Sequence, residues 1–219
     1  MQTMIIRPIL PTQPISPLPI STEMALQMLI FMVYLAVVGT LAFLISRYAV
    51  KCFNGDEKKT AVAFVGISVA IAALLLCFFG FAVSTVKGIL LCLILLFSSY
   101  SDIRTREVPD YIHIMIALTA LIGREPIDIP GMLLSALLIT IPMLMPVIIC
   151  KGKVIGGADV KLSVACTFLL GIGKGIAGLM AGLTIGIFVT LMIHTRKNKA
   201  EGFPLIPYLA AAFMAAYFI

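Results

Sequence analysis

Two aspartates, Asp102 and Asp159, stand where long apolar runs meet polar residues, and their positions suggest chemistry. Asp102 ends the run GILLCLILLFSSYSD, and Asp159 stands before the run VKLSVACTFLL, after the glycines of VIGGAD. An ionisable residue at the border of a membrane span is either a functional group or a simple helix-end charge. Two carboxylates that share a proton can hydrolyse a peptide bond, because one activates water and the other protonates the carbonyl. Such hydrolysis needs no metal, and no cofactor is expected.

The expected helix position of each aspartate suggests its role. Asp159 is predicted at a helix N-terminus, where free amide groups and the helix dipole favour an anion. Asp102 is predicted at a helix C-terminus, where they disfavour it. We therefore expect Asp159 to be the resting base and Asp102 the acid, unless Arg104 pairs with Asp102 and reverses the order. Close carboxylates do not easily both ionise, so the pair should titrate as a unit.

The composition indicates that a lipid bilayer surrounds these residues. The chain has 219 residues, of which 61% are hydrophobic and 12% are charged. A soluble domain is about half apolar and a quarter charged. The net charge of +6 comes from short loops between apolar runs, so membrane topology explains it better than a nucleic-acid partner does. Five scattered cysteines without a CxxC pair indicate neither a disulfide framework nor a zinc site.

Apolar runs of span length recur along the chain and predict an all-α, polytopic bundle. The Pro-rich segment 1–23 is expected to be extended, and 24–219 to form a single transmembrane domain. Eight spans are predicted, at about 24–46, 61–83, 86–102, 108–123, 131–150, 160–173, 175–194 and 204–219. The third, fourth and sixth runs are shorter than a full span unless polar residues at their ends are drawn in toward the headgroups. The glycines of 160–194 are expected to allow close helix packing.

Lysine and arginine predict the orientation of these spans. Cytoplasmic loops retain an excess of positive residues. One set of alternating loops holds twelve of them, and the other set, with the N-terminal segment, holds only Arg7, Lys87, Arg124 and Lys174. The bias predicts eight spans with both termini extracytoplasmic. Asp102 and Asp159 then both lie at the cytoplasmic border.

Three motifs resemble those of type IV prepilin peptidases, members of the GxGD class of intramembrane aspartyl proteases. They are SDIRTREVPD at 101–110, GGADVKL at 156–162 and FPLIPYLAAAF at 203–213. The resemblance covers residues 88–219 by motif and implies that Asp102 and Asp159 form the catalytic dyad. The chain departs from the GxGD pattern at Ala158, where glycine would permit a positive φ or a close backbone approach. Because alanine adds one methyl group, we expect this departure to affect geometry mildly.

Each residue around the dyad has both a possible functional role and a simpler structural explanation. The residues that could bind substrate or shape the site are Arg104, Pro109, Gly156, Gly157, Ala158, Lys161, Pro204 and Pro207. The two prolines Pro109 and Pro204 most simply mark helix starts. Arg104 and Lys161 could orient the dyad or hold lipid phosphates. His113 and His194 are expected to be helix-end polar groups, without the spacing of metal ligands.

The resemblance implies a function at the inner (cytoplasmic) membrane, where the family removes the short basic leader of type IV prepilins and pseudopilins. Members that also methylate the new amino terminus carry a large cytoplasmic insertion with CxxC pairs. The loop 47–60 is short and contains Cys52 alone, so no methyltransferase activity is expected. A compact peptidase serving Flp or Tad-type pilins is predicted. Alternatives are a small proton- or ion-coupled transporter subunit, with carboxylates expected near the midplane, and a structural secretion subunit.

Overall fold

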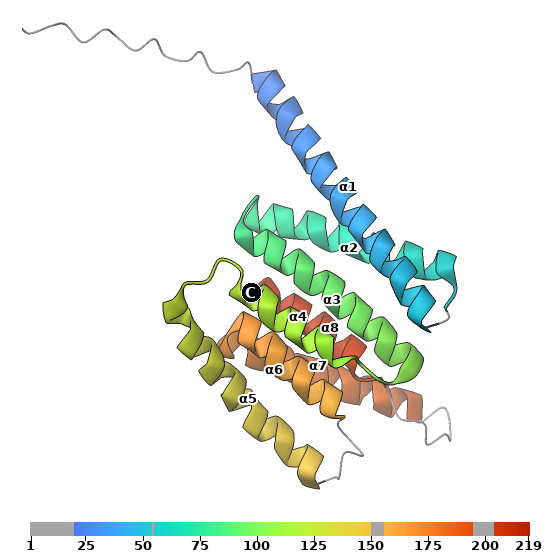
Figure 1. Ribbon diagram of the computed structural model, residues 1–219, viewed down its shortest axis with the longest axis vertical. Helices are drawn as coiled ribbons and strands as arrows, with labels where there is room; N and C mark the ends of the chain where they lie inside the picture. Colours follow the sequence, from blue (N-terminus) through green and yellow to red (C-terminus); the bar gives the residue numbers. More distant parts are fainter. Residues whose placement is uncertain (1–19, 54, 150–155, 195–203) are drawn as a thin grey trace, which may run out of the picture. The chain divides into compact units, whose positions relative to one another are not determined.

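The structure, a computed structural model, describes residues 20–53, 55–149, 156–194 and 204–219. These ranges contain eight α-helices and one short 3-10 helix, and no strand. The helices are α1 (Ile20–Phe53), α2 (Glu57–Phe79), α3 (Val83–Thr105), α4 (Asp110–Leu121), η1 (Pro126–Asp128), α5 (Ile129–Ile149), α6 (Gly157–Leu170), α7 (Ile172–His194) and α8 (Ile206–Tyr217) (Figure 1). The chain divides into two compact units, 1–34 and 35–219. The aspartates lie in the second unit.

The prediction of an all-α chain is confirmed, and one α-helix falls on each of the eight apolar runs. Five helices are long and apolar enough to cross a membrane: α1, α2, α3, the η1–α5 segment and α7. Helices α4 and α6 are short, as expected. The third run reaches span length in the way that the prediction required, because α3 includes the polar residues up to Thr105 and has 23 residues.

Some predictions concern residues outside the described ranges. They include most of the Pro-rich segment 1–23 and five of the positive loop residues, which are Lys151, Lys153, Arg196, Lys197 and Lys199. Both helices extend into the predicted loop 47–60, since α1 ends at Phe53 and α2 begins at Glu57.

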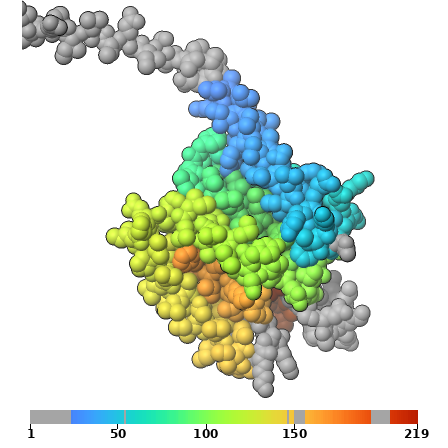
Figure 2. All heavy atoms as spheres, viewed as in Figure 1, coloured from blue at the N-terminus to red at the C-terminus, as the bar shows by residue number. Residues whose placement is uncertain are grey.

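The helices of unit 35–219 lie in two layers. Figure 1 shows α2, α3, α4, α6 and α5 side by side in this order, with α7 and α8 behind them. Helix α8 packs on α3, α6 and α7, and α4 packs on both α3 and α6. Figure 2 shows α4, α5 and α6 on one face of the unit, where side chains of neighbouring helices touch. Helices α4 and α8 therefore lie between the helix that carries Asp102 and the helix that carries Asp159.

Polar contacts join the helix ends that meet near the aspartates. The Thr60 hydroxyl, at the start of α2, lies 3.4 Å from the Tyr100 hydroxyl near the end of α3. The rings of Phe53 and Phe64 also contact Tyr100. The starts of α2, α4, α6 and α8 thus gather at the end of the unit where α3 finishes.

Glycines bring α7 and α8 close together, as the pattern predicted. A Cβ atom added at Gly178 would lie 2.7 Å from Cδ1 of Phe213. One added at Gly182 would lie 2.8 Å from Cδ2 of Leu209 and 3.0 Å from its Cα. Because that Cα belongs to the backbone of α8, a side chain at position 182 would push the two helices apart. A different glycine, Gly171, ends α6 with a φ of 81°, a conformation that favours glycine.

We expect Gly182→Ala to lower the free energy of unfolding by about 1–3 kcal/mol, the usual cost of overpacking a close contact. Thermal unfolding of the purified protein in detergent would measure it. Gly66→Ala is the matched control, because a Cβ atom at this mid-helix position of α2 has no neighbour within 4 Å. That variant should be neutral or slightly more stable. Equal melting temperatures for both variants would contradict the close approach of α7 and α8.

Candidate active site

Asp102 is a buried carboxylate in the last turn of α3, with 8% of its surface exposed. Its Oδ2 accepts a hydrogen bond of 3.2 Å from the backbone N–H of Ile206. Ile206 is the first residue of α8, so its amide has no acceptor within its own helix. The N-terminus of α8 therefore holds the Asp102 side chain in place.

Asp159 is the third residue of α6 and is 9% exposed. Its Oδ2 accepts a hydrogen bond of 3.0 Å from the backbone N–H of Gly156. Asp159 lies outside the five candidate membrane spans. Burial raises the pKa of its carboxyl to about 6; the Gly156 N–H opposes this rise, and the charge of Asp102 adds to it.

Both aspartate carboxylates accept a main-chain N–H at a helix N-terminus, although the two residues lie at opposite ends of their own helices. Asp159 lies at a helix N-terminus, as predicted, and Asp102 lies near a C-terminus. The carboxylate of Asp102, however, also receives an amide from the N-terminus of a second helix, α8. The helix dipole therefore does not by itself separate base from acid. The assignment of Asp159 as base and Asp102 as acid stays a prediction.

The segment after Asp102 forms a hydrogen-bonded turn that leads to α4. Arg106 adopts the left-handed conformation, with φ of 59°, and its N–H donates to the carbonyl of Asp102. The Ser101 hydroxyl donates to the carbonyl of Glu107 over 2.6 Å. Pro109 then precedes α4 directly, as predicted. This turn fixes how the end of α3 and the start of α4 lie beside each other.

Arg104 lies beside Tyr100, with its guanidinium carbon 5.6 Å from the ring centroid. Within the described residues no ion pair joins Arg104 to Asp102. The condition under which Arg104 would reverse the roles of the aspartates is therefore not met in the structure.

Lys161 links the first two motifs. Its Nζ lies 2.6 Å from Oδ1 of Asp110, the first residue of α4. Both side chains are largely exposed, so the pair contributes little stability, on the order of 0–1 kcal/mol. Asp110 belongs to the first motif but was not among the predicted site residues. The signal that could have identified it is its position after Pro109, at the start of a helix.

The glycines before Asp159 have ordinary backbone conformations. Gly156 has φ of −76° and ψ of 153°, and it precedes the first residue of α6, Gly157. Ala158 is the second residue of α6, and its φ is not positive. The departure from the GxGD pattern therefore causes no backbone strain. A Cβ atom at Gly156 would lie 3.3 Å from Oδ2 of Asp159, so that glycine leaves room for the carboxylate.

The two prolines of the third motif flank the start of α8. Pro204 lies two residues before the helix, which begins at Ile206, and Pro207 is in its first turn. Proline is tolerated in this turn because its missing N–H would have no acceptor within the helix. The sequence pointed to the prolines, but the amide between them is the group that contacts Asp102.

His113 is buried, although the sequence predicted only a polar group at a helix end. It lies in the first turn of α4, near a helix end as predicted, but it is buried. Neither ring nitrogen has a hydrogen-bond partner within the described residues. In these ranges no group of three His, Cys, Asp or Glu side chains could hold a metal ion.

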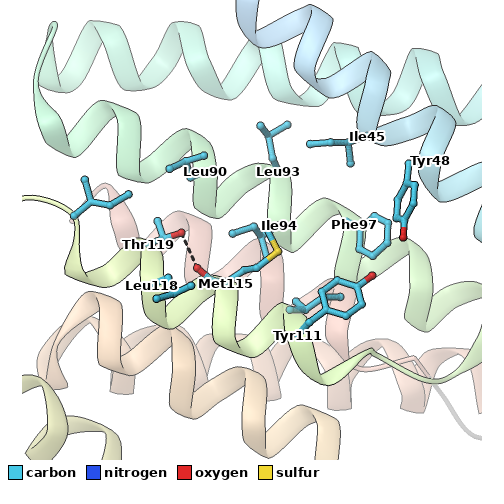
Figure 3. Close-up of a pocket in the computed structure, with 12 residues that line it drawn as sticks. Ile45, Tyr48, Leu90, Leu93, Ile94, Phe97, Tyr111, Met115, Leu118 and Thr119 are labelled. Atoms are coloured by element: carbon cyan, nitrogen blue, oxygen red, sulfur yellow. Dashed lines mark hydrogen bonds between the residues drawn. The ribbon is translucent and has the colours of Figure 1, made fainter.

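Two apolar grooves border the helices of the site. The groove of about 370 Å³ between α2, α3 and α8 includes Ile103 and Pro207, which directly follow Asp102 and Ile206. The other groove, of about 530 Å³, lies between α1, α3 and α4 (Figure 3). Figure 3 shows the hydroxyls of Tyr48 and Tyr111 at one end of it. Neither groove is lined by a carboxylate. They could accommodate apolar segments, whereas the chemistry would lie at the aspartates.

A helical bundle with membrane-length helices and two buried carboxylates at one end defines a membrane protein with a candidate aspartyl site. Residues 89–193 match the sequence model of the type IV leader peptidase family, and this stretch includes both Asp102 and Asp159. The match confirms the resemblance of this part of the chain to a prepilin peptidase family. The third motif lies outside the match. Neither a curated protein nor a solved structure matches the chain.

We expect Ala158→Gly to leave peptidase turnover within about twofold, because Ala158 already has a helical conformation that either residue adopts. Gly156→Ala is the contrasting variant: its methyl group would press on the Asp159 carboxylate, and turnover should fall at least about tenfold, as for other small displacements of catalytic groups. Initial rates of leader cleavage in detergent would measure both. A large gain in Ala158→Gly would show that a closer backbone approach is needed at this position.

Proposed function

We propose that the chain is a membrane-embedded aspartyl endopeptidase that removes the short basic leader of type IV prepilins or pilin-like precursors. One observation carries the proposal: two buried aspartates, each held by a main-chain N–H at a helix N-terminus, lie at the same end of a bundle whose residues 89–193 match the type IV leader peptidase family. The transporter alternative expects carboxylates near the middle of the bundle. Asp102 lies in the last turn of α3 and Asp159 in the first turn of α6, which favours the peptidase.

In the proposed reaction Asp159 takes a proton from water, and the water oxygen attacks the carbonyl carbon of the scissile peptide bond. Protonated Asp102 gives its proton to the carbonyl oxygen, forming a neutral gem-diol. Asp102 then takes a proton from one diol hydroxyl while Asp159 protonates the leaving nitrogen, and the C–N bond breaks. Both aspartates return to their starting protonation states, so the net reaction consumes one water molecule.

The remaining motif residues would position these groups. The start of α6 orients Asp159 through Gly156, Gly157 and Ala158. The Pro204 to Pro207 segment presents the Ile206 amide to Asp102. Pro109 and Lys161 would keep α4 and α6 together at this end, and Arg104 would contact lipid or substrate from its exposed position.

The membrane arrangement fits a substrate with a charged leader before an apolar helix. We propose a multi-pass protein of the inner (cytoplasmic) membrane with eight crossings and both termini extracytoplasmic, in which polar ends of α4, α6 and α8 reach the headgroups. The aspartates would then lie at the cytoplasmic border, where a basic leader is retained. The apolar groove lined in part by Ile103 and Pro207 would receive the apolar part of the substrate. Since only residues 54–56 separate α1 from α2, we propose peptidase activity without methyl transfer.

Co-expression with a candidate prepilin tests the proposal. Wild type, Asp102→Ala and Asp159→Ala would be compared, and loss of the leader would be followed by the mass of the pilin. Cleavage by wild type alone is the expected result. Persistent cleavage in both variants would refute the aspartyl peptidase. Proton or ion flux that depends on the aspartates in reconstituted vesicles, without cleavage, would support the transporter instead.

A further inference from the structure

A second polar site lies at the opposite end of the bundle from the aspartates. A cavity of about 530 Å³ is lined by the starts of α3 and α7 and by the residues that follow α4. Lys87 of α3 lines this cavity, fifteen residues before Asp102 on the same helix. At 1.5 Å per residue the two side chains start about 22 Å apart along the helix axis. This cavity is therefore separate from the candidate active site.

Three cationic side chains from separate parts of the chain line this cavity: Lys87 of α3, Arg124 after α4 and Lys174 of α7. Two carboxylates, Glu125 and Asp128, line it as well. Arg124 Nη1 lies 3.9 Å from Asp128 Oδ2, a distance at the limit for an ion pair. The cavity thus gathers one more positive than negative group. Like charges brought together repel each other unless an anion lies between them.

Lys87 is the member of this cluster that is hardest to explain by structure alone. It is 8% exposed, although a lysine is almost never buried without a partner. Within the described residues its ammonium donates one hydrogen bond, of 3.5 Å, to the carbonyl of Ala120 at the end of α4. An ammonium has three N–H donors. The Lys87 ammonium therefore uses one N–H donor in a long hydrogen bond to the end of α4. The same ammonium lines the polar cavity, where its other donors can bind a ligand.

We propose that this cavity binds a phosphate group, held by Lys87, Arg124 and Lys174. Several N–H donors with positive charge suit a phosphate oxygen cluster, and guanidinium groups pair with phosphate in a bidentate manner. Phospholipid phosphates lie where apolar helices end, in the headgroup layer on either face of a bilayer. Glu125 and Asp128 suit the positive or hydroxyl part of a headgroup and disfavour a dense polyanion. Free inorganic phosphate offers the same chemistry without the acyl chains.

Thermal unfolding of the delipidated full chain in neutral detergent distinguishes these sources. The probes are phosphatidylglycerol, diacylglycerol with the same acyl chains but no phosphate, and inorganic phosphate. Phosphatidylglycerol is expected to raise Tm by about 5 °C at a hundredfold excess over Kd, while diacylglycerol is not. If inorganic phosphate raises Tm equally, the ligand is the free anion; if it does not, the ligand is the lipid headgroup. Equal effects of phosphatidylglycerol and diacylglycerol, or no effect of any probe, would overturn the site.

Variants locate the binding. Lys87→Met and Arg124→Gln are each expected to weaken binding of the active probe at least tenfold, as judged from the dependence of Tm on its concentration. Lys58→Met, an exposed lysine of α2 whose loss leaves the cavity intact, is the matched control and should not change it. If Lys87→Met does not fold, Arg124→Gln and Lys174→Gln carry the same test. If the variants that lack Lys87, Arg124 or Lys174 bind the probe as wild type does, the phosphate does not bind in this cavity.

Discussion

Asp102→Asn and Asp159→Asn are each expected to lower the rate of leader cleavage by about 10³-fold or more, within the range for loss of a general acid or base. The double variant should be little slower than either single one. Two groups that act as one proton-sharing unit lose most of their effect when either is removed, so their losses do not add. Cleavage rates of the purified variants on one prepilin would measure this. Losses that multiply in the double variant would show that the aspartates act independently.

The asparagine variants should keep the fold, which separates a chemical effect from a structural one. The asparagine side-chain oxygen can still accept from the Ile206 or Gly156 amide. Since folding raises the pKa of Asp159, the stability that its protonated form contributes is present at low pH and is lost as pH rises through about 6. The Asp159→Asn variant, whose amide is neutral at every pH, is therefore expected to match or exceed the wild-type Tm at neutral pH. Glu57→Gln, an exposed carboxylate at the same end of the bundle, should leave cleavage unchanged.

The sequence alone was sufficient to locate the helices and to place the two aspartates near helix ends. Apolar runs fix where helices form, because a bilayer requires continuous apolar segments with internal backbone hydrogen bonds. Helix ends were less accurate: α3 extends to Thr105, beyond the predicted 102, because helices continue into polar residues at the border. The glycine spacing correctly indicated close helix packing, but it did not identify α8 as the partner of α7.

The contacts that orient the aspartates could not be predicted, because they join residues far apart in the chain. Ile206 donates to Asp102 across 104 residues, and nothing in its side chain marks this role. That bond depends on the position of α8, which packs on α3, α6 and the glycines of α7. The dipole argument considered each aspartate on its own helix and therefore missed α8. The same limit applies to the Lys161–Asp110 pair, where each charge alone is explained by its place in a loop or at a helix end.

The pH dependence of cleavage is the second large effect that we expect. The active dyad holds one proton, and losing that proton leaves two carboxylates without an acid. Because burial, opposed by the Gly156 amide and increased by the Asp102 charge, raises the pKa of Asp159 to about 6, this proton should be lost and the rate should fall as pH rises through this value. Well above it, the fall should approach tenfold per pH unit, as for loss of a single essential proton. A rate that stays constant up to about pH 8, well above that pKa, would contradict a shared proton.

The Asp102→Asn variant tests whether the two carboxylates interact. The charge of Asp102 raises the pKa of Asp159, so removing that charge should lower this pKa and shift protonation of Asp159 to more acidic pH. The infrared carbonyl band of a protonated carboxylic acid, followed against pH and identified by its loss in the Asp102→Asn, Asp159→Asn double variant, would measure the shift. Glu57→Gln, which is also one charge less negative, corrects for the net charge of the protein. An Asp159 pKa that is the same with and without Asp102 would mean that the aspartates titrate separately, and a shared proton could not then be the basis of the reaction.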